Sequence, residues 1–378
     1  MFDQIFNFFR KSYLTLNKIE VSRDNLIQNY RYLASLDKRV KIAPVVKSNG
    51  YGHGIVNVAK ILDNISFPFF CVDSLFEAYE LQNANITSPI LIMGYTNPEN
   101  FRIKKLPFSF AIFDLETAKV LDEFQPDCKV HIFVDTGMHR EGVPIKDLPK
   151  FLEEIKKLPN IKVKGLMSHL ASSEGSKDPL FLAQIKEYKK AKEILEKYKV
   201  SPKWFHISAT GAIINPATRP IIASVSNLAR AGLALYGYSS SIFDKNLKPA
   251  LTLTTKIAQI KQLNKGEKIG YDGTYTAKKD IVIGVLPIGY YDGVDRRLSN
   301  KGVFLIDGVE CPILGRISMN INIIDLSKVK NPKVGQEVVV YSGNPEDINS
   351  LESCAKVCNA IPYELLVNLT ETTRRVVV

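Results

Sequence analysis

The chain has 378 residues, of which 45% are hydrophobic and 24% are charged, with 22 glycines and 19 prolines along its length. This length and composition exclude disordered, collagen-like and small disulfide-stapled proteins, and they predict a globular chain of two or three domains. The formal net charge is +11, but the lysines are interspersed with Glu and Asp and no recognition motif accompanies them, so we expect no nucleic-acid partner.

The first segment, MFDQIFNFFRKSY at residues 1–13, has Phe2, Ile5, Phe6 and Phe9 at helical spacing. It is too short and too polar to span a membrane, and it has an Asp where a signal peptide requires positive charge. We therefore expect an N-terminal extension that forms a packing or interface helix, no membrane association, and a cytoplasmic protein.

Residues 14–246 alternate short apolar runs with longer amphipathic stretches, a pattern typical of parallel strands joined by helices. The stretch from Leu180 to Lys199 has apolar residues at spacings of three and four, which predicts a helix. No GxGxxG motif follows the first strand, so eight such units favour an N-terminal (β/α)8 TIM-type barrel over a doubly wound sheet. The eight expected strands end at Lys47, Asp73, Gly94, Phe113, Asp135, Leu170, Ser208 and Gly237.

From residue 247 to 378 the pattern changes. Apolar runs such as DIVIGVLPI, GVFLI and EVVVYSG are separated by the turns NKGEK, SNKG and NPED, and the next helical pattern begins only at residue 349. Short apolar runs separated by turn sequences predict a mainly antiparallel C-terminal β domain.

Five cysteines form no CxxC pair, and an odd number is a poor disulfide framework. Cys354 and Cys358 lie one helical turn apart, but no nearby His or second pair completes a zinc site. We expect buried, reduced thiols and no metal.

Residues at the carboxyl ends of barrel strands face the active site in this fold. Lys47 follows the first strand, where a partly desolvated amine suits Schiff-base chemistry, although a strand-capping cation is the alternative. The motif VVKSNGYGHG adds three glycines that let backbone approach a ligand and the hydroxyl of Tyr51, and an ordinary glycine-rich turn is equally compatible. The other polar residues at expected strand ends, which together with Lys47 predict a converging site, are Asp135, His139, Arg140, Ser168, His169, His206 and Arg230.

These motifs resemble the alanine racemase family, whose members are pyridoxal 5'-phosphate enzymes with an N-terminal barrel and a C-terminal β domain. The resemblance runs from about Leu14 to Val378. It is carried by VVKSNGYGHG, VDTGMHREG, RAGLALYG and the pair IGYDGTY with PIGYYDGVDRRLSNKG.

The resemblance implies that Lys47 holds the cofactor as an internal aldimine and acts as one acid/base group, with Tyr271 as the other. Two groups are needed because inversion requires proton removal on one face of the α-carbon and delivery on the opposite face. By resemblance, His169 and Arg230 belong to the network that assists Tyr271, and Arg230 faces the pyridine nitrogen. The cofactor phosphate would be bound by Tyr51, Thr210, Gly232, Leu233 and Tyr363.

Arg140 and Met319 correspond to residues that contact the substrate. In the family the tyrosine base and this methionine come from the partner subunit, which implies a homodimer with shared active sites. Four positions depart from the family pattern. Phe133 stands where a modified lysine often steadies the arginine, so Arg140 needs another anchor or an inorganic anion. Ser318 and Asn320 replace the commoner Cys and Asp beside Met319, and Ala209 replaces a usual Asn.

The sequence therefore predicts an alanine racemase that interconverts L- and D-alanine and supplies D-alanine for cell-wall peptidoglycan. Tyr271 and Tyr363 would narrow the pocket beyond the α-carbon and favour a methyl side chain. A broader racemase acting on serine or a basic amino acid, a decarboxylase on the same barrel and a non-catalytic pyridoxal-phosphate-binding protein remain the alternatives.

Overall fold

The computed structural model describes residues 14–173, 175–239 and 244–378. The chain divides into two compact units, each treated by itself below: Ser22–Ala250, and residues 14–21 together with Leu251–Val378. Residues 14–21, which we expected in the barrel domain, thus belong with the C-terminal unit, and the barrel unit extends past residue 246. The helix expected near the N-terminus lies outside the described residues.

The first unit is a closed parallel barrel, as the sequence predicts. Its strands pair side by side in parallel from β3 to β9, and again from β10 through β11 to β2. A parallel bridge between Val45 and Cys71 joins β2 to β3, and Ile207 alone separates β9 from β10, so the ring closes. The strands are β2 (Lys41–Pro44), β3 (Phe70–Val72), β4 (Ile90–Ile92), β5 (Ser109–Ile112), β6 (Cys128–Asp135), β8 (Ile161–Met167), β9 (Trp204–His206), β10 (Ser208–Ala209) and β11 (Leu228–Ala231).

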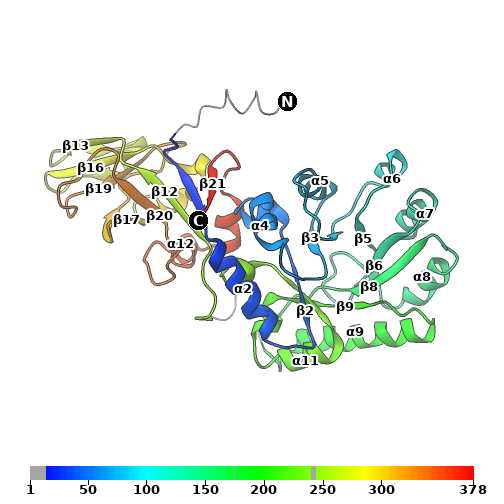
Figure 1. The fold of residues 1–378 in the computed structure, drawn as a ribbon. Coiled ribbons are helices and arrows are strands. Elements are labelled where there is room, and N and C mark those ends of the chain that lie inside the picture. The colour runs from blue at the N-terminus through cyan, green and yellow to red at the C-terminus, as the bar shows by residue number, and fades with distance from the viewer. Residues whose placement is uncertain (1–13, 174, 240–243) are drawn as a thin grey trace. The chain divides into compact units, whose positions relative to one another are not determined.

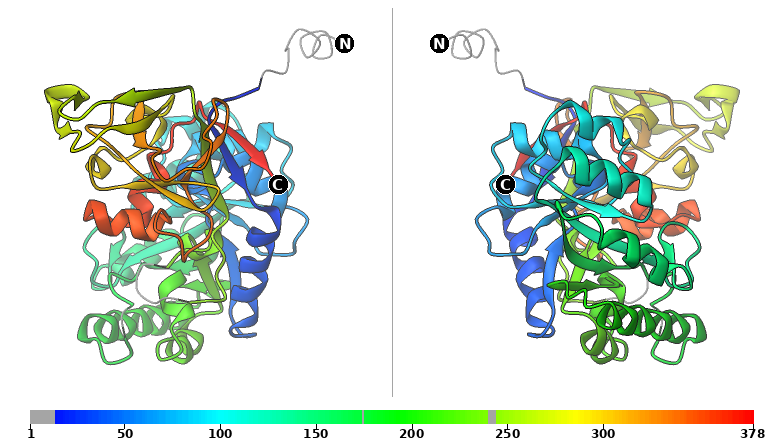
Figure 2. Two further views of the ribbon diagram at one scale, coloured as in Figure 1. Left: turned by 90° about the vertical axis from the view of Figure 1, so that its left-hand side faces the viewer. Right: turned by 90° about the vertical axis from the view of Figure 1, so that its right-hand side faces the viewer.

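Helices surround these strands on the outside, as Figures 1 and 2 show for α5 to α9. Several begin where a polar side chain follows a strand and accepts a hydrogen bond from the first turn, because helix N-termini leave backbone N–H groups unpaired. Ser74 forms a capping box with Glu77, and Asp114 accepts from Thr117 N. The helices are α2 (Arg23–Ser35), α3 (Lys47–Tyr51), α4 (Ile55–Leu62), α5 (Leu75–Asn83), α6 (Glu99–Ile103), α7 (Leu115–Phe124), α8 (Leu148–Ile155), α9 (Pro179–Lys197), α10 (Thr210–Ile214) and α11 (Arg219–Val225).

Three expected strands end three or more residues earlier than predicted: β2 at Pro44, β8 at Met167 and β11 at Ala231. The eighth strand is Leu228–Ala231, and most of the run GLALYG that we predicted as this strand forms the 3-10 helix η1 (Leu233–Tyr236). Its apolar residues are buried in a helical turn, and an apolar run this short does not distinguish strand from helix. Lys47, expected as the last residue of the first strand, is the first residue of α3. The long helix expected from Leu180 to Lys199 is confirmed as α9.

The second unit is built from mainly antiparallel sheets. Its largest sheet has the order β18-β17-β20-β12-β1-β21, in which β1 pairs antiparallel with β12 and parallel with β21. A second sheet has the order β13-β16-β19, and β14 pairs with β15. The strands are β1 (Lys18–Val21), β12 (Leu251–Lys256), β13 (Gln259–Leu263), β14 (Lys268–Ile269), β15 (Tyr275–Thr276), β16 (Ile281–Leu286), β17 (Val303–Ile306), β18 (Val309–Pro312), β19 (Asn322–Asp325), β20 (Glu337–Tyr341) and β21 (Arg374–Val377). Two helices, α12 (Leu351–Cys358) and α13 (Pro362–Val367), complete the unit, as do the 3-10 turns η2 (Tyr271–Gly273), η3 (Tyr290–Asp292) and η4 (Arg296–Leu298).

All five cysteines are buried free thiols, as predicted. None of the described helices is both long and apolar enough to cross a lipid bilayer.

Candidate active site

The turn that begins with Lys47 has an unusual backbone. Ser48, Asn49, Gly50 and Tyr51 all have φ between 51° and 59°, in the left-handed region that costs L-residues about 1 to 2 kcal/mol each. Side chains hold this turn: Asn49 Oδ1 accepts from Ile55 N at 2.9 Å, and Glu77 Oε1 accepts from Ser48 N at 2.6 Å. Strain retained in this way is characteristic of functional sites.

Lys47 points from this turn to a carboxylate that the sequence reasoning did not single out. Its Nζ lies 2.8 Å from Oδ1 of Asp73, the residue that directly follows β3. Neighbouring strands of a parallel sheet end at the same edge. The position of Asp73 directly after an apolar run is therefore the sequence feature that could have indicated its contact with Lys47. The ion pair holds the amine at the carboxyl end of the barrel.

Arg230 is the buried cation at the centre of the site. Its NH1 donates to Nδ1 and to the carbonyl of His206, at 2.8 and 2.9 Å, and its NH2 donates to the Ser168 carbonyl at 2.6 Å. Because arginine only donates, His206 Nδ1 must accept, and burial keeps the pKa of His206 well below its ordinary value. The proton of His206 therefore sits on Nε2, which donates to His131 Nδ1 at 2.8 Å.

His131 was not identified from the sequence. It lies inside β6, and a Cβ at Gly165 on the neighbouring strand β8 would come within 2.1 Å of its Nδ1. The glycine therefore makes room for the ring. Burial, followed by the charge of Arg230, lowers the pKa of His131 to about 3.

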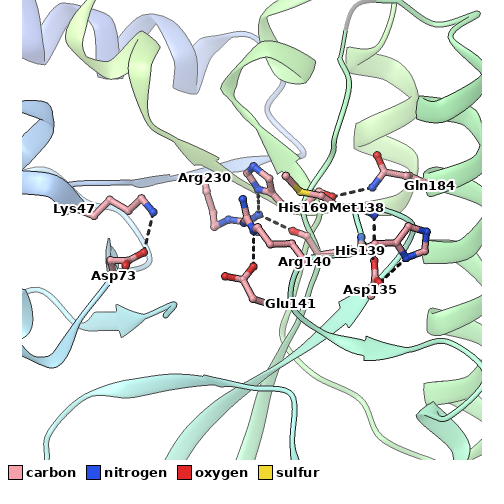
Figure 3. A network of polar contacts seen from close by, with 11 residues as sticks. Lys47, Asp73, Asp135, Met138, His139, Arg140, Glu141, His169, Gln184 and Arg230 are labelled. Carbon is pink, nitrogen blue, oxygen red and sulfur yellow. Dashed lines mark hydrogen bonds and ion pairs between the residues drawn. The ribbon is translucent and has the colours of Figure 1, made fainter. Parts of the chain in front are cut away.

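His169 faces three cations. Its Nδ1 accepts from Arg230 NH2 at 3.1 Å, and burial, Arg230, Arg140 and Lys47 together lower its pKa to about 3. The ring is neutral with its proton on Nε2. In Figure 3 the side chains of Lys47, Arg230 and Arg140 extend into the same region, which makes this end of the barrel suited to an anionic ligand.

Hydroxyl groups gather around Gly232, just beyond β11. The Gly232 N–H donates to Thr210 Oγ1 at 2.9 Å, and a Cβ at this glycine would lie 2.6 Å from Tyr51 Oη. The ring of Tyr51 packs on Tyr236 with centroids 5.0 Å apart. Tyr51, Thr210, Gly232 and Leu233 are thus brought together, and their hydroxyl and amide groups are of the kind that binds phosphate.

The loop after β6 presents Arg140 and turns His139 away. Asp135 Oδ1 accepts from the backbone N–H groups of Gly137, Met138 and His139 at 2.9 to 3.1 Å. His139 pairs with Asp135 Oδ2 and its side chain is 85% exposed, so it does not join the converging group that we expected. Arg140 Nε donates to Glu141 Oε2 at 2.6 Å.

Phe133 belongs to an apolar cluster at the same end of the barrel. It packs with Ala111 and Met167, and the half-buried Met93 and Phe113 lie against them. The rings of Phe113 and Phe133 meet edge to face with centroids 6.4 Å apart. Phe133 also borders a small hollow lined by Asp135, Met138, Arg140, Glu141, Ser168 and His169, so charged side chains lie close to it.

The remaining expected residues, Tyr271, Met319 and Tyr363, lie in the second unit. Tyr271 begins η2, where Gly270 and Asp272 have positive φ and Asp272 pairs with Arg316. Met319 lies beside η3, since its carbonyl accepts from Tyr291 N at 2.9 Å. Tyr271 and Met319 are 67% and 55% exposed, whereas burial raises the pKa of Tyr363.

Both units match known families. The family model for the alanine racemase N-terminal domain matches residues 21–240 of this chain. The family model for the alanine racemase C-terminal domain matches residues 250–377.

Similar proteins agree with this division. An alanine racemase 2 of Caldanaerobacter subterraneus subsp. tengcongensis is 34% identical over 95% of this chain and 94% of its own, and an alanine racemase of Borreliella burgdorferi is 32% identical over 94% and 96%. Among solved structures, the alanine racemase of Clostridium difficile 630 covers 97% of both chains at 30% identity with a TM-score of 0.88. A Bacillus anthracis alanine racemase with bound L-Ala-P has a TM-score of 0.88 at 29% identity, covering 97% of this chain and 96% of that one.

Proposed function

The chain belongs to the alanine racemase family, and from this premise we propose that it interconverts L-alanine and D-alanine with pyridoxal 5'-phosphate as its cofactor. The observation that carries the proposal is the convergence, within one unit, of Lys47, the buried Arg230 and the hydroxyl groups around Gly232. This cofactor requires an amine to bind its aldehyde, a hydrogen-bond donor for its ring nitrogen, and neutral hydroxyl and amide groups for its phosphate. Lys47, Arg230 and the groups around Gly232 would supply these in turn.

The residues of the barrel fit the cofactor chemically. Lys47 Nζ would bind its aldehyde carbon, and Tyr51, Thr210 and the backbone of Gly232 and Leu233 would bind its phosphate, with Tyr363 as a further ligand. A side chain at Gly232 would collide with Tyr51 Oη, so the cradle depends on a glycine here. Pyridoxal phosphate, when bound, withdraws electron density from the α-carbon of the amino acid and so makes its proton acidic.

Arg230 would donate to the pyridine nitrogen. Its partners His206, His169 and the Ser168 carbonyl are all neutral, so no carboxylate competes for its charge among them. Arginine does not give up its proton, so the nitrogen would stay unprotonated and electron withdrawal would be weaker than with an acid partner. This arrangement favours return of the proton to the α-carbon over side reactions such as transamination.

Lys47 and Tyr271 would move the proton. Lys47 Nζ would serve one face of the α-carbon and Tyr271 Oη the other, which inversion requires. Arg140 would bind the substrate carboxylate, Met319 would help to enclose the substrate, and Tyr271 and Tyr363 would restrict the side chain to the size of a methyl group.

A homodimer with shared active sites would bring Tyr271 and Met319 to the partner's barrel. Large apolar side chains are exposed on these loops, among them Tyr271, Tyr291 and Met319, and backbone hydrogen bonds join the η3 loop to the Met319 loop. Exposed groups of this kind mark interaction surfaces. We place the enzyme in the cytoplasm, where it would supply D-alanine for peptidoglycan.

Borohydride reduction of the purified protein with its cofactor, followed by mass spectrometry, tests the proposal. We expect the modification on Lys47 and loss of optical activity with alanine in an amino-acid panel. Tyr271→Phe should keep the visible absorbance of the bound cofactor while racemisation collapses. A label on another lysine, or equal rates with serine or basic amino acids, would contradict the proposal.

A further inference from the structure

Arg140 stands on a backbone that is fixed at both ends. Asp135 ties down the start of the loop through three backbone N–H groups. At its end, Gly142 has a φ of 119°, and a Cβ there would lie 2.5 Å from Asp135 N, so this glycine packs directly on β6. The backbone on either side of Arg140 is therefore fixed, but its long side chain still needs a partner to hold one orientation.

The cations of the site repel the guanidinium. The charges of Arg140 and Arg230 act on each other, and both act with Lys47 on His169. The Arg140 side chain is 54% exposed, so without a nearby negative charge it would gain by turning toward water.

Two possible anchors can be set aside. Both carboxylate oxygens of Asp135 already bind the loop backbone and His139. Part of the Phe133 side chain packs on Ala111, Met167 and other apolar side chains, which offer no donors to an anion. The hollow that Phe133 lines together with Arg140, Ser168 and His169 is too small to admit even a water-sized ion.

Glu141 supplies the charge instead. Its Oε2 accepts from Arg140 Nε at 2.6 Å, a short, charge-assisted bond. Bonding through Nε leaves the two terminal nitrogens of Arg140, which together bind a carboxylate as a fork, for the substrate. Figure 3 shows Glu141 beside Arg140 in this arrangement.

We propose that Glu141 is a positioning residue that holds the Arg140 guanidinium for binding the substrate carboxylate. This inference rests on the proposed function and names the anchor that Phe133 cannot provide. Glu141 acts through Arg140 and does not itself contact the reacting atoms.

The test compares Glu141→Gln and Glu141→Asp with the wild-type holoenzyme. The control is Glu99→Gln, which breaks an exposed Glu–Arg ion pair with Arg102 in α6, away from the site. The probe is 2-aminoisobutyrate, an alanine analogue without an α-hydrogen, which binds but cannot be racemised, and its binding is followed by the absorbance of the bound cofactor. For Glu141→Gln we expect roughly 3- to 10-fold weaker analogue binding and a matching rise in KM for alanine, with a smaller change in kcat.

Glu141→Asp should lie between wild type and Glu141→Gln, and Glu99→Gln should match wild type. Replacing chloride by gluconate at constant ionic strength should leave wild-type KM unchanged, whereas Glu141→Ala should regain affinity when formate is added. Wild-type binding in Glu141→Gln, or a chloride requirement in the wild type, would overturn the inference. Failure of the wild type to racemise alanine would instead refute the proposed function, because analogue binding is measured separately.

Discussion

Acidification should destabilise the barrel through its buried histidines, and His131 allows this effect to be measured. Burial and Arg230 lower the pKa of His131 to about 3 in the folded protein, against about 6.5 in an unfolded chain. Between these values the unfolded chain binds the extra proton, so stability falls as pH falls. Lowering the pH from 7 to 5.5 should therefore cost about 1.3 kcal/mol of unfolding free energy for this one ring.

The substitution His131→Asn isolates this contribution. Asn can still accept from His206 Nε2 but does not titrate, so any loss of packing affects both pH values equally. Unfolding in urea can be followed by fluorescence of Trp204, the single tryptophan, which lies in β9 and reports on the barrel unit. The wild type should lose about 1.3 kcal/mol more than His131→Asn between the two pH values.

A matched control is Ile132→Val, the buried neighbour of His131 on the same strand. It should lower stability by about 1 kcal/mol at both pH values, because it removes one methylene and no titrating group. Equal pH-dependent losses in the wild type and His131→Asn would refute the reasoning, since the ring would then carry a proton in the folded state or remain solvated.

Other perturbations follow from the site geometry. Gly232→Ala should weaken cofactor affinity at least about tenfold by equilibrium dialysis, because its Cβ would lie 2.6 Å from Tyr51 Oη, and unchanged affinity would argue against the cradle. Phe133→Ala should open a cavity in the apolar cluster and lower the free energy of unfolding by about 3 kcal/mol, measured as a lower urea midpoint. A smaller loss would mean that the neighbouring side chains move in to fill the cavity. Asp73→Asn should slow borohydride-trappable cofactor attachment at Lys47 while Trp204 fluorescence stays native, and wild-type attachment would count against a role for the ion pair.

The sequence predicted the barrel because parallel strands buried on both faces appear as continuous apolar runs, as Phe70–Val72 and Ile90–Ile92 do. It misplaced the eighth strand because Leu233–Tyr236 is equally apolar but helical, and a run of this length does not separate the two conformations. The assignment of residues 14–21 was wrong for a different reason. β1 pairs with β12, which lies more than 200 residues later in the sequence, and local sequence patterns do not predict a pairing over such a distance.

The same distinction applies to the site. Lys47 follows β2 and Arg230 lies in β11, and both belong to motifs that stand out locally. His131 lies within β6 and has no such signal, and its importance depends on Gly165 of the next strand and on His206 beyond it. Glu141 resembles any exposed acid until its distance from Arg140 is known.

The position of β1 between β12 and β21 has a consequence for synthesis on the ribosome. β1 emerges first, but both of its hydrogen-bonding neighbours emerge only after the whole barrel has been translated. The barrel can fold while the nascent chain is still growing, whereas the backbone N–H and C=O groups of β1 stay unpaired until β12 and β21 have been translated. A chaperone that covers this strand until release would protect the protein from pairing with other chains.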